Sequence, residues 1–198
     1  MRIGYGWDSH EFKSGIPLKI GGVELPHDKG LAGHSDGDVL LHALTDALLG
    51  AVAAGDIGSY FPPSDPRWKG ANSAIFLEEA LKQIKKAGYS VANVDSTLIL
   101  AEPKIVPHAK KIQARVAELL GIKPDQVGIK AKTPEGMGTD NAAIAHAAVL
   151  LHPSPPAHSF RKVRGTRGTR KSGAVRGPRP KQVKGARGGT KRRKPRRQ

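Results

Sequence analysis

The sequence predicts an α/β protein of the two-layer α+β type, in which helices cover one face of a mixed β-sheet. Segments rich in β-branched and aromatic residues alternate along the chain with segments whose apolar residues recur at helical spacing. No internal repeat interrupts this alternation. It favours a layered fold, because each amphipathic helix must bury its apolar stripe against another element.

The chain begins with extended structure. Residues 1–12 alternate as a strand does, and the two sides differ: Ile3, Tyr5 and Trp7 against Gly4, Gly6 and Asp8. Glycines then separate two further short strands, Leu18–Ile20 and Val23–Leu25.

Residues 33–56 predict a buried helix with a polar side, capped by Ser35 or Asp36 and ended by Gly55. Asp38, His42 and Asp46 recur at the i, i+4 spacing, so they share one side of this helix. Seven other positions recur at helical spacing and form an apolar stripe: Val39, Leu40, Ala43, Leu44, Ala47, Leu48 and Ala51. Because polar groups on a core helix are costly to bury, we expect a ligand on the polar side.

The rest of the domain alternates helices and strands. Residues 56–70 hold too many prolines and glycines for regular structure and are expected to form a loop. Residues 91–101 and 127–131 predict strands, and residues 108–120 a helix that follows Pro107 and ends at Gly121. Residues 141–152 stay ambiguous between helix and strand. A further amphipathic helix over 73–87 ends at Gly88 and turns four residues inward: Ile75, Phe76, Ala80 and Ile84.

The composition changes at residue 153 and divides the chain into a folded domain, 1–153, and a tail, 154–198. The 198-residue chain has a formal net charge of +16, yet the part before Arg161 carries 16 basic and 17 acidic residues. From Arg161 on there are 17 basic residues and no acidic ones. The tail has hardly any large apolar side chains to bury, so we expect it to be disordered.

Composition also limits the function classes. The chain has no cysteine, so any metal must be bound by His, Asp or Glu. No apolar run reaches the roughly 20 residues that span a bilayer, and the N-terminus lacks a secretory pattern. We expect a cytoplasmic enzyme or binding protein without a membrane partner. The basic tail adds an alternative, a protein that binds nucleic acid nonspecifically through phosphate contacts.

Asp8, His10 and His42 predict a metal site. Asp8 and His10 lie two residues apart on the first strand, so their side chains share a face. If His42 packs against that face, the three form the N and O donor set of a catalytic zinc site with an open fourth position. Asp46, one turn further, would then hold the second ring nitrogen of His42. The alternative is that each histidine is simply a half-buried, hydrogen-bonded residue.

Five motifs occur in a recognisable order over residues 1–152: Asp8-Ser9-His10, His34-Ser35-Asp36-Gly37-Asp38, His42 with Asp46, Asp56-Ile57-Gly58, and Phe61-Pro62-Pro63-Ser64-Asp65. In these motifs the chain resembles the 2-C-methyl-D-erythritol 2,4-cyclodiphosphate synthase family. The resemblance implies a phosphorus–oxygen lyase of the non-mevalonate isoprenoid pathway. Such an enzyme cyclises 4-diphosphocytidyl-2-C-methyl-D-erythritol 2-phosphate to 2-C-methyl-D-erythritol 2,4-cyclodiphosphate and releases CMP.

The resemblance also implies roles for individual residues. Asp8, His10 and His42 match the ligands of Zn²⁺, and Glu135 matches the ligand of a Mg²⁺ or Mn²⁺ that bridges the diphosphate. His34 and Thr133 match the family's transition-state stabilisers. The positions that match substrate-binding residues are Ser9, Ser35, Asp56, Ile57, Gly58, Phe61, Ser64, Asp65, Ala101, Pro103, Lys104, Ile105, Val106 and Lys132. Asp56 would accept hydrogen bonds from the sugar hydroxyls, and residues 101–106 resemble the cytidine pocket.

The chain departs from the family pattern at residues 136–141. Relatives have a longer segment there with an arginine that contacts phosphate, and this chain has none. Lys132, where many relatives have a threonine, is our candidate for supplying the missing charge.

The resemblance further implies a homotrimer whose sheets line the centre, with active sites between subunits. In that fold residues 141–152 form a strand. The rival function is nucleic-acid binding through the tail, with the folded domain as a trimeric scaffold.

Overall fold

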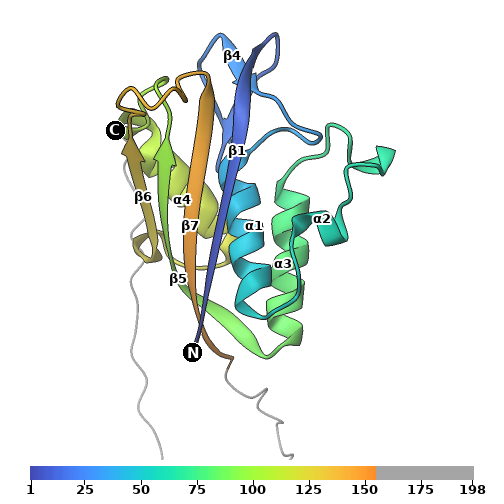
Figure 1. Cartoon of the computed structure of the whole chain (residues 1–198). Coiled ribbons are helices and arrows are strands. Elements are labelled where there is room, and N and C mark those ends of the chain that lie inside the picture. Colours follow the sequence, from blue (N-terminus) through green and yellow to red (C-terminus); the bar gives the residue numbers. More distant parts are fainter. Residues whose placement is uncertain (155–198) are drawn as a thin grey trace, which may run out of the picture. The chain divides into compact units, whose positions relative to one another are not determined.

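The computed structural model describes residues 1–154, which form a five-stranded sheet with helices on one face (Figure 1). The strands lie in the order β4-β1-β7-β5-β6, and β2 pairs with β3 in a separate small sheet. The helices are α1 (Val39–Ala51), α2 (Ile57–Tyr60), α3 (Ala74–Lys86) and α4 (Ala109–Leu120). The strands are β1 (Arg2–Ser14), β2 (Leu18–Ile20), β3 (Val23–Leu25), β4 (Lys29–Leu31), β5 (Tyr89–Ile99), β6 (Val127–Lys132) and β7 (Ala142–Pro153). The predicted two-layer α+β class is confirmed.

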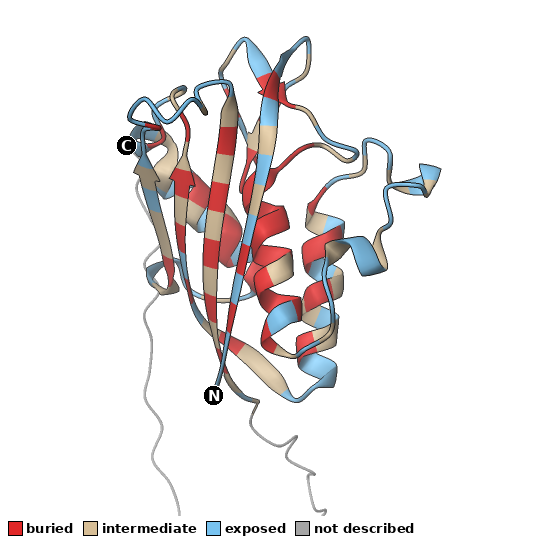
Figure 2. Cartoon of the chain, in the orientation of Figure 1, coloured by how far each residue is buried: buried red, intermediate tan, exposed pale blue. Residues whose placement is uncertain are grey.

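The sheet is mixed, as expected. Its central strand β7 pairs antiparallel with β1 and β5, β4 pairs antiparallel with β1, and β6 runs parallel to β5. The ambiguity over residues 141–152 resolves to a strand. Every second residue of β7 from Ala143 to Leu151 is buried beneath the helices, a period of two that no helix produces (Figure 2). The small alanines of β7 favour close packing of α1.

Helix α1 is the buried centre of the helical layer, and almost all its side chains are inaccessible (Figure 2). The helix begins at Val39, and its N-cap is Asp38, whose carboxylate accepts the backbone N–H of Leu41 at 3.0 Å. The predicted caps, Ser35 and Asp36, are therefore wrong. Asp38 also accepts the N–H groups of Gly21 and Gly22 at 2.8 and 2.6 Å, which ties the start of α1 to the β2–β3 turn.

Two glycines allow α1 to lie directly on β1. A Cβ atom at Gly4 would stand 1.8 Å from the backbone oxygen of Ala47, and one at Gly6 would stand 2.3 Å from that of Ala43. Neither oxygen belongs to a flexible side chain. The absence of a side chain at these positions therefore sets the distance between helix and strand.

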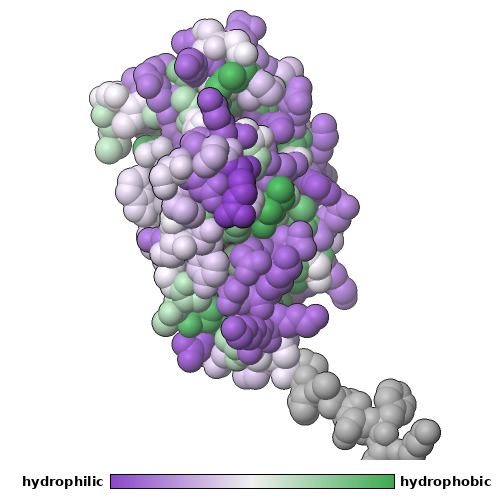
Figure 3. Space-filling model, turned by 90° about the vertical axis from the view of Figure 1, so that its right-hand side faces the viewer, coloured by the Kyte–Doolittle hydropathy of each residue, from purple (hydrophilic) through white to green (hydrophobic). Residues whose placement is uncertain are grey.

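The predicted loop over residues 56–70 is only partly irregular. It contains α2, capped by Asp56, and a 3₁₀ turn at Pro66–Trp68, capped by Asp65. Side-chain capping by aspartate supports these short elements despite the prolines. Ile75, predicted to be inward, is 46% exposed because it shares the solvent side of α3 with Glu78 and Glu79. The surface on this side is mostly hydrophilic, with small apolar groups between (Figure 3).

The other face of the sheet carries exposed apolar residues. Ile3, Tyr5 and Trp7 of β1 are 75%, 61% and 56% exposed, and no described helix covers them. None of the described helices is long and apolar enough to cross a membrane. The predicted disorder of the tail concerns residues beyond 154, which lie outside the described part, although Ser154 itself hydrogen-bonds to Gly88 and Ser90.

Candidate active site

Asp8, His10 and His42 converge on one point between β1 and α1. Oδ2 of Asp8 lies 2.7 Å from Nε2 of His10 and 2.9 Å from Nδ1 of His42, and the two nitrogens are 3.0 Å apart. Within residues 1–154 they are the one group of three potential metal ligands whose donor atoms all lie within 4.8 Å of one another. The predicted convergence is confirmed.

The fold explains this convergence. Asp8 and His10 continue the side of β1 that carries the two small glycines, so they face the helical layer. His42 lies in the first turns of α1, which the close contact at Gly6 brings onto the strand. The strand thus supplies two donors and the helix supplies the third.

The charges of the cluster suit a cation. Burial alone would raise the pKa of Asp8. The hydrogen bonds and positive charges of His10 and His42 outweigh burial and hold this pKa well below its usual range. Burial lowers the pKa of His10, but the hydrogen bond and negative charge of Asp8 raise it above its usual value. Asp8 is therefore an anion, and the cluster offers two nitrogens and one oxygen, the donor types that zinc accepts at about 2.0–2.2 Å. These residues fit a divalent metal with one position left open.

The second ring nitrogen of His42 has partners other than the predicted one. Nε2 lies 2.9 Å from Oγ of Ser73 and 3.0 Å from Oγ of Ser35. Asp46 instead accepts the backbone N–H of Ile57 at 2.8 Å. The expected contact from Asp46 to His42 is therefore wrong. Asp46 joins α1 to α2, and burial raises its pKa.

A pocket of about 240 Å³ opens beside His10 and His42. Five further predicted residues are in its wall: His34, Ser35, Ile57, Gly58 and Phe61. Pro63 of the predicted 61–65 motif is also in the wall, and sequence reasoning missed two others, Trp68 and Phe76. Phe76 belongs to the predicted inward side of its helix, and its ring lies 4.5 Å from that of Phe61. Trp68 could have been identified as a candidate because it is a large aromatic residue within the proline-rich residues 56–70.

Other predicted residues border this pocket without lining it. Asp56 accepts the N–H and hydroxyl of Ser59, which lowers its pKa. Asp65 binds the guanidinium of Arg67, while its backbone oxygen lies 3.3 Å from Nε2 of His34. Ser64 lies in the same segment. Ser9 is an exception and does not border the pocket, because it lies on β1 between two metal-ligand candidates and its side chain points to the opposite face.

The predicted nucleotide side of the site forms a second pocket, of about 530 Å³. It gathers predicted residues from the ends of β5 and β6 and from the segments after them: Pro103, Lys104, Ile105, Val106, Lys132, Thr133 and Glu135. Ala101 lies at a neighbouring pocket, and its carbonyl oxygen lies 3.5 Å from Nζ of Lys104. The hydroxyl of Thr133 donates to the carboxylate of Glu135.

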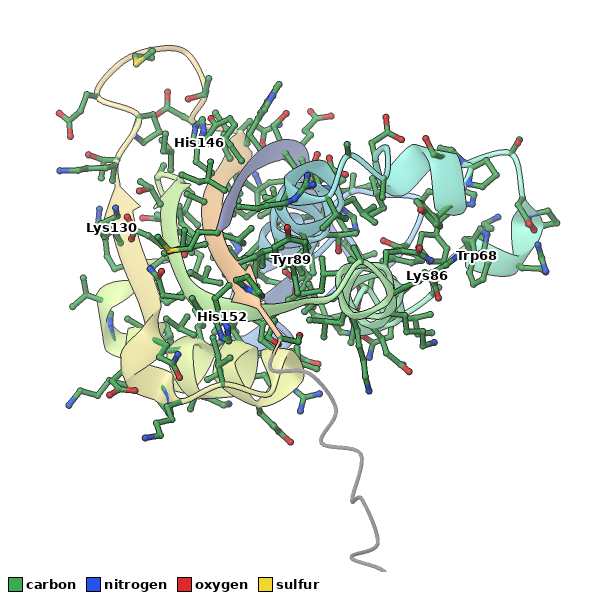
Figure 4. The ribbon with its side chains drawn as sticks, turned by 90° about the horizontal axis from the view of Figure 1, so that it is seen from below. Trp68, Lys86, Tyr89, Lys130, His146 and His152 are labelled. Atoms are coloured by element: carbon green, nitrogen blue, oxygen red, sulfur yellow. The ribbon has the colours of Figure 1, made fainter. Side chains whose placement is uncertain are left out.

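One chain does not bring the two pockets together. They share no residue, and β7 and β5 separate β1 from β6 in the sheet. Seen from below, Trp68 beside the first pocket and Lys130 of β6 lie at opposite sides of the domain (Figure 4). Glu135 and Thr133 therefore do not reach the metal cluster of their own chain.

Known proteins resemble this chain over the domain that carries both pockets. A sequence model of the YgbB family matches residues 1–152. The 2-C-methyl-D-erythritol 2,4-cyclodiphosphate synthase of Koribacter versatilis (strain Ellin345) is 68% identical over 151 residues, which cover 76% of this chain and 97% of the relative. A solved structure of a synthase of this name is 44% identical, with a TM-score of 0.73 over 76% of this chain and all of the other. A CDP complex of IspF from Plasmodium falciparum is 36% identical, with a TM-score of 0.68 over 78% of this chain and 97% of the other. The chain belongs to the YgbB family, the family of the 2-C-methyl-D-erythritol 2,4-cyclodiphosphate synthases.

Proposed function

We propose that this chain cyclises 4-diphosphocytidyl-2-C-methyl-D-erythritol 2-phosphate to 2-C-methyl-D-erythritol 2,4-cyclodiphosphate and releases CMP. The observation that carries the proposal is the convergence of Asp8, His10 and His42 beside a pocket lined by His34 and Ser35, in a chain that is 68% identical to a synthase of that name. The reaction is an internal phosphoryl transfer, which needs positioning and charge stabilisation but no protein nucleophile.

Asp8, His10 and His42 would hold Zn²⁺, and Glu135 would hold Mg²⁺ or Mn²⁺. Bound there, the cations neutralise phosphate charge and act as Lewis acids. His34 and Ser35 line the same pocket as two of these ligands, so they can donate hydrogen bonds to phosphate oxygens. The apolar wall from Ile57 to Phe76 excludes water from the methylerythritol part. Asp56, at the N-terminus of α2, would accept hydroxyl hydrogens.

The second pocket would complete the site from a neighbouring subunit. Residues 101–106 would bind cytidine, while Thr133 and Lys132 would contact the diphosphate. This division requires a second subunit, because the two pockets of one chain lie apart. The resemblance to the family makes that assembly a homotrimer with a site at each interface. Exposed Ile3, Tyr5 and Trp7 support the proposal, since they form an apolar row on a sheet face suited to burial between subunits.

The alternative function, nucleic-acid binding by the tail, concerns residues outside the described part and stays a prediction. The same holds for the domain boundary at residue 153 and for a cytoplasmic location. Residues 1–154 support the enzyme function over the nucleic-acid-binding one, because they contain both pockets and the cluster of potential metal ligands.

Phosphorus NMR tests the proposal directly. The full chain, incubated with substrate, zinc and magnesium, is expected to yield the resonances of the cyclic diphosphate and of CMP. A chelator should abolish both, added zinc and magnesium should restore them, and a His42→Ala chain should form neither. A chain that ends at residue 154 should behave as the full chain does. If the full chain forms neither product, the proposed reaction is refuted. If both products persist with chelator and with His42→Ala, the metal site is refuted.

A further inference from the structure

Ser73 occupies the N-cap position of α3, yet its side chain does not cap that helix. No hydrogen bond joins it to the first turn of α3. The residue is fully buried, and its hydroxyl is turned toward α1, where it lies 2.9 Å from Nε2 of His42. Here the hydroxyl is directed to a ligand of the proposed metal site instead.

Asp36 fixes the direction of this hydrogen bond. Oγ of Ser73 lies 2.5 Å from Oδ1 of Asp36, which also accepts the backbone N–H of Ser73 at 3.2 Å. Nζ of Lys19 forms an ion pair with the other carboxylate oxygen at 3.4 Å. An ionised carboxylate only accepts hydrogen bonds, and a hydroxyl has a single proton. Ser73 must therefore donate its proton to Asp36.

The consequence falls on His42. Because the proton of Ser73 is engaged, its oxygen can only accept from Nε2 of His42, which must then carry the ring proton. When the ring is neutral, Nδ1 therefore keeps the lone pair, and Nδ1 is the atom that faces Asp8 and His10. We propose that Asp36 and Ser73 are positioning residues that hold His42 in the tautomer able to bind a metal through Nδ1. For the metal, this inference rests on the proposed function.

Ser35 does not have this effect. Its oxygen lies 3.0 Å from the same nitrogen and 3.3 Å from that of Ser73, but no carboxylate engages its proton. Its hydroxyl can donate or accept, so it imposes no tautomer. It also lines the pocket, where it is available to a phosphate. Ser73 and Asp36 therefore orient His42, and the half-buried Ser35 is left for the ligand.

A competition titration with a chromophoric chelator measures the effect on zinc affinity. In the full chain, Ser73→Ala should raise the dissociation constant of Zn²⁺ about 10–100-fold, as for other residues that orient a ligand. Ser96→Ala is the matched control, because it removes an equally buried hydroxyl that donates to the Gly128 carbonyl at 2.8 Å, away from the cluster. It should keep the parent affinity, and Ser73→Thr should recover most of it. Equal affinity in Ser73→Ala and parent would overturn the inference, with thermal unfolding confirming that each variant is folded.

Nitrogen-15 NMR of the imidazole rings reads the tautomer without metal. In metal-free protein, well above the usual histidine pKa, His42 should be protonated on Nε2 in the parent and should lose this preference in Ser73→Ala. A parent ring protonated on Nδ1 would overturn the inference. If the parent binds no zinc but shows the Nε2 tautomer, the metal part of the proposed function fails and the role of Ser73 is upheld.

Discussion

Replacing Gly6 by alanine should separate α1 from β1 and weaken the metal site. The new Cβ would stand 2.3 Å from the backbone oxygen of Ala43 and 2.7 Å from the nitrogen of Ala47. Ordinary contacts begin at 3.4 Å, so the helix must move by about 1 Å. His42 lies next to Ala43 in the sequence and would move with it, away from Asp8 and His10.

The expected cost has two parts. Overpacking of this kind destabilises a protein by about 1–3 kcal/mol, which urea unfolding measures as a lower midpoint with an unchanged slope. A displaced ligand also lowers zinc affinity, by an amount that the chelator competition reports. A misplacement of about 1 Å can cost on the order of 100-fold in rate, so kcat should fall as well.

Gly50→Ala is the matched control, because Gly50 lies on the same helix and faces the same strand. Its new Cβ would meet only the Tyr5 oxygen, at 4.0 Å. Alanine is a better helix former than glycine, so this variant should gain about 0.5–1 kcal/mol with unchanged zinc affinity. A Gly6→Ala chain as stable as the parent and equal to it in zinc affinity would refute the idea that this contact positions His42.

Three further changes test other parts of the chain. Asp38→Ala should lower the free energy of unfolding by about 2–5 kcal/mol, because three N–H groups, two of them buried, lose their acceptor; a loss below about 0.5 kcal/mol in urea unfolding would contradict this. Lys132→Ala should raise KM about tenfold, because the loss of one charged hydrogen bond to phosphate weakens substrate binding by about that factor. An unchanged KM and kcat in the phosphorus assay would show that Lys132 does not contact the substrate. Truncation after Ser154 should leave kcat and KM unchanged and abolish salt-sensitive retention on immobilised RNA, and equal retention of both chains would exclude the tail as the binding segment.

The sequence predicted the elements that local periodicity encodes. Alternation along β1 and helical spacing along α1 predicted both elements, and together they predicted Asp8, His10 and His42 as a cluster. The N-cap of α1 could not be predicted in the same way, since Ser35, Asp36 and Asp38 are all good capping residues. The choice depends on the β2–β3 turn, whose N–H groups engage Asp38.

The partners of His42 could not be predicted, because they come from another element. Asp46 lies on the expected side of α1, but the ring of His42 extends away from it toward α3. Ser73 had the sequence pattern of a helix cap and gave no sign of this second use. The separation of the two pockets follows from strand order, which spacing along one chain does not encode.

Packing sets the metal site in two ways that meet at His42. The contact at Gly6 sets how far the helix lies from the strand, and on our proposal Ser73 sets which ring nitrogen of His42 carries the proton. These effects should not add, because both act through one side chain. Once Gly6→Ala has displaced α1, the geometry of the hydrogen bond from His42 to Ser73 is already disturbed, so Ser73→Ala should weaken zinc binding less in that background than in the parent. Full additivity in the double-variant cycle would mean that the glycine contact and the serine act on different ligands.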